Sequence, residues 1–309
     1  MGLSTDSRPV ILAGGTGFLG VNLARMLVNQ GRKVVILSRS EPDQGEWTWA
    51  KWDGKAQGDW SSIVDGAHAI INFSGKSIDC YPNPENKKLI LSSRVDPTRA
   101  LGEAIRRATV QPSVWVQLSA VGIYGNTTSA IPESTPAGEG FLPDTCLKWE
   151  AAFREACPNS IRDVTLRSGV VLGAANGALP TLRRLARFGL GGAAGNGKQG
   201  ISWIHEQDMT SILLRAIDDA SMQGVYNACS PNPASNRDFM RTLRKVVGVP
   251  IGPPAPAFAV RIGAKLVLKT NPDLALEGQY AIPQRLMDEG FEFTHPNLDD
   301  ALKDLCKKD

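Results

Sequence analysis

Three glycines spaced three residues apart, Gly14, Gly17 and Gly20, point most directly to chemistry in this sequence. They follow an apolar run at 10–13 and precede a stretch with the apolar spacing of a helix at 21–29. In such a strand–turn–helix corner, the first glycine permits a tight turn, the second lets the backbone approach a pyrophosphate, and the third lets helix and strand pack closely. The helix N-terminus offers free N–H groups and a partial positive charge. We predict a bound nucleotide cofactor; the alternative is an ordinary glycine-rich turn.

The end of the next expected strand, at 33–38, indicates which dinucleotide is bound. Chains that bind NAD usually carry Asp or Glu there, to hold the ribose 2′-hydroxyl. This strand instead ends in Ser38 and Arg39. A guanidinium can bind a 2′-phosphate with a forked, charge-assisted contact, whereas Glu41 lies too far along to be the simple ribose partner. We predict NADP(H); the alternative for Arg39 is a solvated surface arginine.

Composition limits the other kinds of chemistry. Three isolated histidines and the absence of Cys-x-x-Cys give no reason to expect a metal site. Five scattered cysteines suit a reducing cytoplasm better than a disulfide framework. A formal net charge of +3 is too small to argue for a nucleic acid or an anionic membrane as partner. The expected partner is a small-molecule substrate, and a homodimer is left open.

Strand-like and helical patterns alternate through the first 170 residues or so. The expected strands lie at 10–13, 33–38, a short segment ending near Trp52, 68–73, 113–119 and 164–172, and the expected helices include 87–108 and 144–157. This alternation predicts an α/β protein with a Rossmann-type doubly wound parallel sheet. Ligands of such sheets bind outside the carboxyl ends of the strands.

The last two-fifths of the chain have a different character. The sequence shows a glycine-rich stretch, a proline-dense linker, an amphipathic helical pattern and a strand–helix ending, at 189–200, 250–256, 258–268 and 291–305. We expect a smaller C-terminal α/β lobe on the substrate side. The predicted division is a Rossmann domain at 1–173, completed by parts of 201–230, with the smaller lobe formed by 174–200 and 231–309.

Several motifs together resemble one protein family. They are Gly14-Gly-Thr-Gly-Phe-Leu-Gly20, Trp52-Asp53, Ile71-Asn-Phe-Ser-Gly75, Ser119-x-x-x-x-Tyr124-Gly125, Trp149-Glu150, Leu166-Arg167-x-Gly169-Val-Val-Leu-Gly173 and Trp203-Ile-His205. The chain resembles the extended short-chain dehydrogenases/reductases. Within them it is similar to the atypical, sugar-nucleotide-epimerase-like branch of the NAD-dependent epimerase/dehydratase family, which ends in a domain of unknown function.

The resemblance implies a set of NADP contacts. It implies pyrophosphate contacts from Thr16, Gly17, Phe18 and Leu19, 2′-phosphate contacts from Ser38 and Arg39, and ribose and pyrophosphate contacts from Phe73 and Ser74. It also implies that Arg94 approaches the cofactor and that Val171 lies at the nicotinamide. The alternative for Arg94 is a helix-surface charge, and for Phe73 and Val171 it is core packing.

The proton-transfer pair of the typical family members is missing. Those members use Tyr-x-x-x-Lys, in which the ammonium lowers the tyrosine pKa into a useful range. Alignment on Trp149-Glu150 places Leu142 and Cys146 at the two positions.

Three residues remain as candidates for the catalytic role. Ser119 could orient a substrate oxygen, and Tyr124 or His205 could donate a proton, although packing and support of the lobe are the competing roles. Typical nucleotide-sugar enzymes place an arginine where Ile201 stands here. We predict an NADP(H)-dependent oxidoreductase or epimerase acting on a small carbonyl or hydroxyl compound. The alternative is a non-catalytic NADP-binding protein with a regulatory or interaction role, for example in cell division.

Overall fold

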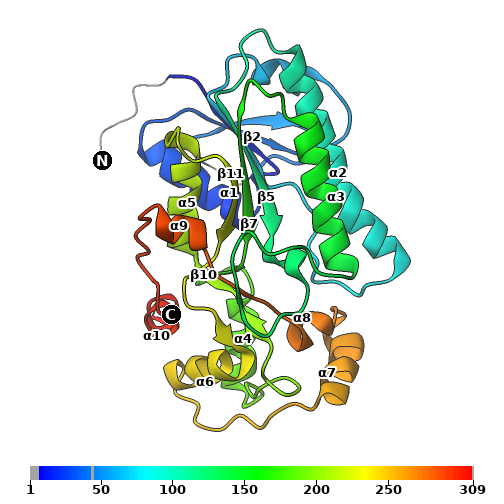
Figure 1. The fold of residues 1–309 in the computed structure, drawn as a ribbon, viewed down its shortest axis with the longest axis vertical. Coiled ribbons are helices and arrows are strands. Elements are labelled where there is room, and N and C mark those ends of the chain that lie inside the picture. The colour runs from blue at the N-terminus through cyan, green and yellow to red at the C-terminus, as the bar shows by residue number, and fades with distance from the viewer. Residues whose placement is uncertain (1–6, 43–44, 308–309) are drawn as a thin grey trace.

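The computed structural model of the chain describes residues 7–42 and 45–307. A seven-stranded sheet in the order β11-β7-β5-β4-β1-β2-β3 forms its centre, and all neighbouring strands in it are parallel (Figure 1). Its strands are β1 (Val10–Ala13), β2 (Val34–Ser38), β3 (Thr48–Lys51), β4 (Ala69–Asn72), β5 (Val114–Ala120), β7 (Arg162–Ser168) and β11 (Gly224–Ala228). The predicted Rossmann-type doubly wound fold is confirmed.

Helices cover both faces of this sheet, as buried parallel strands require. On one face lie α1 (Phe18–Asn29) and α5 (Glu206–Asp218), and on the other α2 (Pro84–Arg107) and α3 (Phe141–Ala156). Successive strand residues face opposite sides: in β1, Val10 and Leu12 join one core cluster, while Ile11 and Ala13 join the other. The short 3-10 helices η1 (Asp59–Val64) and η2 (Val121–Tyr124) complete this part.

The strand order reverses beside β1, which lies between β2 and β4. The loops that leave β1 and β4 therefore diverge to opposite sides of the sheet, and sheets of this kind bind ligands in a crevice between such loops, at the carboxyl ends of the strands. The glycine loop at 14–17 follows β1 and the segment at 73–75 follows β4, and we refer to the region between them as the crevice. This topology is what places the candidate cofactor residues in one region.

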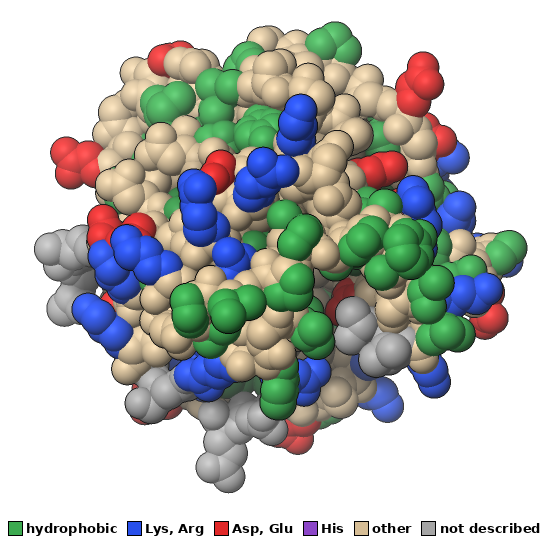
Figure 2. All heavy atoms as spheres, turned by 90° about the horizontal axis from the view of Figure 1, so that it is seen from below, with side chains coloured by type: hydrophobic (Ala, Val, Ile, Leu, Met, Phe, Trp, Pro, Cys, Tyr) green, Lys and Arg blue, Asp and Glu red, His purple; other side chains and the backbone are tan. Residues whose placement is uncertain are grey.

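A smaller lobe lies below the sheet. It contains the helices α4 (Leu179–Arg187), α6 (Asn236–Val246), α7 (Ala257–Gly263), the π-helical turn η3 (Ala264–Leu268) and α8 (Asp273–Leu276). Three two-stranded pairings accompany it: β8 (Val170–Leu172) with β10 (Trp203–His205), β9 (Gly200–Ile201) with β12 (Ala234–Ser235), and β6 (Ala130–Ile131) with β13 (Tyr280–Ala281). Seen from below, the lobe exposes many hydrophobic side chains (Figure 2). In the described ranges, no helix is both long and apolar enough to cross a bilayer.

The single strand expected at 164–172 is wrong, because the chain changes sheets at Gly169. Strand β7 ends at Ser168 in the main sheet, and β8 pairs with β10 instead. A Cβ at Gly169 would lie 2.5 Å from the Ser202 carbonyl oxygen, so only glycine allows this close approach. The apolar run continues through the change of partner, and sequence periodicity therefore does not show it.

The strand expected at the start of 291–305 is also wrong. Residues 291–297 have no regular secondary structure and lead into α10 (Leu298–Cys306). The buried Asp208 carboxylate accepts the backbone N–H groups of Thr294 and His295 at 2.8 and 3.0 Å. The Asp208 side chain thus accepts hydrogen bonds from backbone N–H groups that would otherwise pair with a neighbouring strand.

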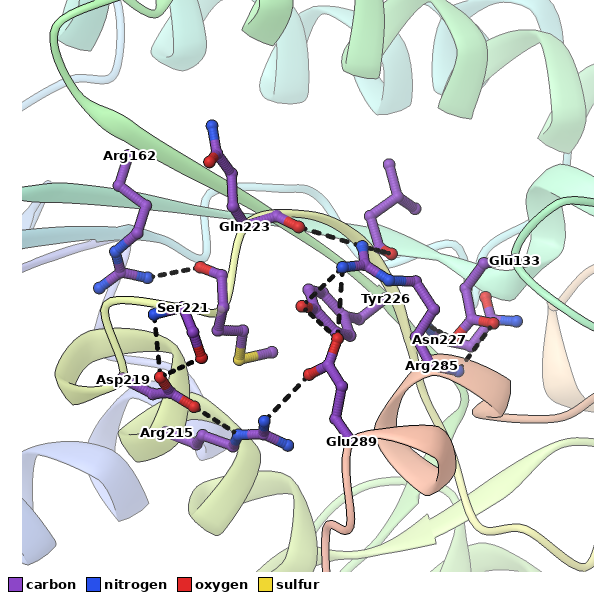
Figure 3. A network of polar contacts seen from close by, with 12 residues as sticks. Glu133, Arg162, Arg215, Asp219, Ser221, Gln223, Tyr226, Asn227, Arg285 and Glu289 are labelled. Carbon is purple, nitrogen blue, oxygen red and sulfur yellow. Dashed lines mark hydrogen bonds and ion pairs between the residues drawn. The ribbon is translucent and has the colours of Figure 1, made fainter.

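The last helix before this segment, α9 (Gln284–Asp288), closes the β11 edge of the sheet (Figure 3). The Arg285 guanidinium donates to the carbonyl oxygens of Gln223 and Val225 and stacks 3.8 Å from the centre of the Tyr226 ring. Glu289 accepts the Tyr226 hydroxyl and pairs with Arg215 at 2.9 Å. An edge covered in this way has few free groups for pairing with another strand.

Candidate functional site

The glycine loop and the end of β4 meet at the crevice. Gly14 has a φ of +69°, and a Cβ there would lie 2.9 Å from Ser74 Oγ. The Ser74 N–H is itself fixed by the Asn72 side chain, at 3.0 Å. Two predicted cofactor residues from separate strands are therefore in direct contact, as a dinucleotide lying across the switch point would require.

The start of α1 has the features of an anion-binding helix end. Gly17 is its N-cap, no side chain caps it, and no acidic residue lies in its first turn. A Cβ at Gly17 would meet no protein atom within 4 Å, whereas a Cβ at Gly20 would lie 2.4 Å from the Gly15 carbonyl oxygen. Gly17 thus leaves space open outside the corner, and Gly20 allows the helix to pack tightly against the loop. The first turn of a helix has free N–H groups, which can donate hydrogen bonds to a phosphate placed in that open space.

The remaining pyrophosphate candidates surround this corner. Thr16 is exposed and Leu19 is half-buried against the core. The Phe18 ring reaches across to the end of β8, since a Cβ at Gly173 would lie 2.4 Å from Phe18 Cζ. Val171 is half-buried and packs on the same core cluster. The structure thus brings the glycine loop and β8 together.

Arg39 lies at the carboxyl end of β2 beside an open cleft of about 560 Å³. Trp52 and Trp60 form part of the wall, with ring centres 5.1 Å apart. Within 7–42 and 45–307, no carboxylate pairs with the exposed Arg39 guanidinium. Ser38 is buried. Its hydroxyl donates a hydrogen bond to the Ser40 carbonyl and accepts one from the Trp49 indole at 3.0 Å. Ser38 therefore fixes the turn, while Arg39 remains available for a ligand.

Arg94 of α2 lies between the β4 loop and α3. Its guanidinium donates to the carbonyl oxygens of Lys76 and Ile90 and lies 5.1 Å from the centre of the Trp149 ring. Its carbon Cζ would be 3.3 Å from a Cβ at Gly75. Burial lowers the pKa of Arg94, and the one titratable group that opposes this shift is the Cys146 thiol rather than a carboxylate. A largely desolvated cation thus lies at the crevice with only neutral partners among the described residues.

A buried ion pair lies beneath the crevice, between Glu150 of α3 and Arg167 of β7. Arg167 Nε and Nη2 each donate to one Glu150 oxygen at 2.9 Å, and Ser119 Oγ donates to the same carboxylate at 2.7 Å. Although burial acts in the opposite direction, these bonds to Glu150 raise the pKa of Arg167. The carboxylate is held by three bonds, which is the condition for a stable buried charge.

Tyr124 extends this network to β11. Its hydroxyl accepts from Arg167 at 2.9 Å and donates to Asn227 Oδ1 at 2.8 Å. Asn227 is itself fixed, because its backbone N–H donates to Glu133. Burial raises the pKa of Tyr124. The structure therefore brings Ser119 and Tyr124 into one network, but the Tyr124 hydroxyl is used inside it.

His205 lies in a different environment from the other two catalytic candidates. Its Nδ1 accepts the N–H of Gln207, which caps α5, and its ring stacks on His295 with centres 3.8 Å apart. Burial and the neighbouring His295 lower the pKa of His205. The proton of the neutral ring then lies on Nε2, 3.4 Å from Asp304. The ring atoms of His205 contact α5 and the C-terminal segment, not Ser119 or Tyr124.

His205, His295 and Asp304 also place their ligand atoms within 4.8 Å of one another. Coordination of a metal by His205 Nε2 would require the proton to move to Nδ1, where the Gln207 N–H already donates. The cap of α5 and a metal at this position are therefore incompatible, and we assign no metal here.

Comparison with known proteins supports the arrangement. Residues 10–146 match the model of the NAD dependent epimerase/dehydratase family, and residues 255–305 match a domain of unknown function, DUF1731. The epimerase family protein YfhF of Bacillus subtilis is 35% identical over 96% of this chain and 97% of its own length. The human epimerase family protein SDR39U1 is 34% identical over 96% of this chain and 99% of its own.

This chain belongs to the NAD dependent epimerase/dehydratase family. A crystal structure of the human protein SDR39U1 with NADPH has a TM-score of 0.86 and 32% identity, covering 97% of this chain and 99% of that one. A Corynebacterium glutamicum structure described as a nucleoside-diphosphate sugar epimerase has a TM-score of 0.78 and 31% identity, covering 97% of this chain but 58% of its own.

Within the epimerase family, the departure at the tyrosine and lysine positions has a clear structural consequence. Leu142 has no ionisable group, and burial, with a contribution from Glu150, raises the pKa of Cys146 to about 11. The thiol is therefore protonated at neutral pH and provides no cation. The guanidiniums of Arg94 and Arg167 are the positive charges that act on this thiol, and they come from α2 and β7 rather than from α3.

Local sequence patterns did not predict the ion pair itself. Glu150 and Arg167 both stand in motifs that carry the family resemblance, but nothing local shows that they face each other across α3 and β7. The available signal was an acidic residue on the apolar face of a helical pattern. A charge in such a place needs a partner elsewhere in the chain.

The second and third glycines of the motif, Gly17 and Gly20, give a matched test of the site. The variant Gly17→Ala should keep the thermal stability of the parent, because its Cβ enters open space, yet lose about tenfold or more in NADPH affinity by calorimetry. Gly20→Ala should lower the melting temperature, because its Cβ meets backbone. If Gly17→Ala binds NADPH as tightly as the parent, the open space at α1 is not the pyrophosphate site.

Proposed function

We propose that this chain is an NADP(H)-dependent oxidoreductase or epimerase of atypical mechanism, acting on a small carbonyl or hydroxyl compound. The observation that carries the proposal is the uncapped start of α1 with open space at Gly17, combined with Arg39 at the end of β2, which has no carboxylate partner in the described ranges. The name of the family and the NADPH of the human crystal structure support a nicotinamide cofactor of this kind.

The residues at the crevice fit such a cofactor. The N–H groups of residues 16–20 would hold the pyrophosphate, with Ser74 on its other side. Arg39 would pair with the 2′-phosphate, and Phe73 and Val171 would provide apolar contacts. When bound, the nicotinamide supplies the hydride chemistry, and the protein supplies binding and orientation.

Arg94 would provide the positive charge of the site. A desolvated cation with only carbonyl partners is costly unless an anion completes it. The crevice beside Gly75 is where the phosphates of the cofactor would lie, so their charge would offset that of Arg94. The guanidinium would also favour negative charge that develops on a substrate oxygen nearby.

Ser119 would orient the substrate. Its proton is directed to Glu150, which leaves the Ser119 oxygen as a hydrogen-bond acceptor. The Ser119 oxygen would therefore accept a hydrogen bond from a hydroxyl of the substrate, while Tyr124 would stabilise the wall of the site through its hydrogen bond with Arg167. The proton donor would then be water, because the Tyr124 hydroxyl already donates to Asn227 and the ring of His205 contacts other elements.

A second function is favoured by the residues found where the family's proton donors would lie. The positions of the family's proton-transfer pair hold Leu142 and a protonated thiol, and the hydroxyl of Tyr124 is bonded on both sides. An NADP-binding protein without turnover, acting in regulation or interaction, would have these features.

The nucleotide preference tests the role of Arg39. NADPH should bind at least about tenfold more tightly than NADH, the value of a charge-assisted contact to the 2′-phosphate. The variant Arg39→Ala should remove the preference by weakening NADPH binding alone. Lys33→Ala, at the opposite end of β2, is the control and should change neither affinity. Equal affinities of the parent for the two coenzymes would refute the assignment.

The role of Arg94 is tested by a change of charge. Arg94→Gln should weaken NADPH binding by about tenfold at low salt, because a neutral amide cannot offset the phosphates. Arg94→Lys should retain part of the affinity. The exposed Arg99, on the same helix, is the control, and Arg99→Gln should bind like the parent. An unchanged affinity of Arg94→Gln would assign the guanidinium a purely structural role.

Turnover separates the two functions. A panel of small carbonyl compounds with NADPH, and of hydroxyl compounds with NADP⁺, is followed by nicotinamide absorbance with the protein in excess over cofactor, so that a transient bound product is also seen. We expect at least one compound to change the absorbance, and Gly17→Ala to abolish the change. A flat response to the whole panel, with tight NADPH binding retained, would favour the regulatory function instead.

A further inference from the structure

Exposed apolar side chains are concentrated on one face of the smaller lobe. The five large hydrophobic residues of the described chain that are more than 60% exposed all belong to it, and Ile262 joins them at 55%. We refer to this surface as the apolar face; its residues are Phe188, Leu190, Ile251, Phe258, Ile262 and Leu266. Figure 2 shows hydrophobic side chains gathered there, with Lys and Arg among them.

Two segments distant in sequence are joined to build this face. Ala194 and Ala255 form an isolated bridge, and the N–H of Gly195 donates to the Ala255 carbonyl at 2.8 Å. Arg244 of α6 donates to the Gly191 carbonyl at 2.6 Å and fixes the segment that follows Leu190. The apolar residues of both segments are therefore displayed by an ordered framework.

The helical part of the face has an amphipathic pattern turned outward. Phe258, Ile262 and Leu266 are spaced four residues apart, which places them on one side of α7 and η3. No residue of α7 is buried. Arg261 and Lys265 stand one position before two of the apolar residues, at the border of the stripe. A helix that exposes its apolar side and flanks it with cations is typical of segments that lie in a membrane interface.

The charge of the two segments selects the partner. Residues 174–200 and 247–272 together contain seven Lys and Arg and no Asp or Glu. A second copy bound through the same face would bring cations against cations, which opposes association. An anionic lipid surface offers both negative head groups and an apolar layer. The net charge of +3, from which no membrane partner was expected, conceals this uneven distribution.

We propose that the chain docks through the apolar face onto the surface of a membrane that contains anionic phospholipids. The apolar side chains enter the boundary between head groups and acyl chains, and the bordering cations contact lipid phosphates. In Figure 1 the face belongs to the lower lobe, so docking leaves the sheet and its crevice on the far side of that lobe. Docking through this face does not depend on the cofactor or on the proposed reaction.

Co-sedimentation of the full chain with vesicles tests the proposal. Vesicles of phosphatidylcholine with a third phosphatidylglycerol should bind the protein, pure phosphatidylcholine should bind it far less, and added salt should weaken the binding. The variant F258S/I262S/L266S should lose most of the bound fraction while keeping its melting temperature, because these side chains are exposed. Val110→Ser, an exposed apolar residue outside the face, is the control and should bind like the parent.

A second variant tests the charge alone. R261Q/K265Q should weaken vesicle binding by about fivefold for each cation removed, at low salt. Absence of binding to the anionic vesicles would overturn the proposal, as would binding that ignores lipid charge. If the parent is a dimer in sedimentation velocity and F258S/I262S/L266S is a monomer, a second copy covers the face, and the membrane assignment is likewise overturned.

Discussion

The buried pair between Glu150 and Arg167 is the constraint on which the arrangement of the site depends. It joins α3 to β7, and through Ser119 and Tyr124 it also holds the ends of β5 and η2. Removing water from two charges is expensive, and the cost is offset only when the geometry is good and every remaining polar atom has a partner. Here the guanidinium fork meets both carboxylate oxygens, and hydroxyls occupy adjacent positions. Any change in the position of α3 relative to the sheet would break this set.

The same pair explains why residues of chemically useful type are unavailable at the crevice. A carboxylate that already accepts three bonds cannot serve as a general base, and the Tyr124 hydroxyl is fixed between Arg167 and Asn227. In typical family members, a lysine one turn before the glutamate would lie beside this network. The present chain has a protonated Cys146 there instead, so the network is neutral where it meets the crevice. The positive charge beside the crevice is that of Arg94, which belongs to α2.

The sequence predicted what depends on short stretches of chain. The strand, glycine turn and helix at 10–29, the alternation of the sheet and the contact region of Ser74 follow from local pattern and from the geometry of parallel strands. The ion pair could not be predicted in the same way, because Glu150 and Arg167 are brought together only by the packing of a helix on a sheet. The change of sheets at Gly169 was missed for a related reason. An apolar run has the same appearance whether or not its hydrogen-bond partner changes.

The hydrogen-bond partners of four arginines indicate where an anionic ligand would complete a positive charge of the protein. Arg162 donates to the carbonyl oxygens of Ala216, Ile217 and Met222, around the end of α5, and Arg167 is satisfied by Glu150. These two guanidiniums have their partners inside the protein and do not require a ligand. Arg39 and Arg94 differ from them, since neither has a carboxylate partner in the described part of the chain. Arg39 lines the cleft at the end of β2, and Arg94 contacts the loop that follows β4. A folded chain tolerates such cations at little cost when a ligand completes them. Their position, more than any residue of catalytic type, supports the proposed binding of an anionic ligand at the carboxyl ends of the strands.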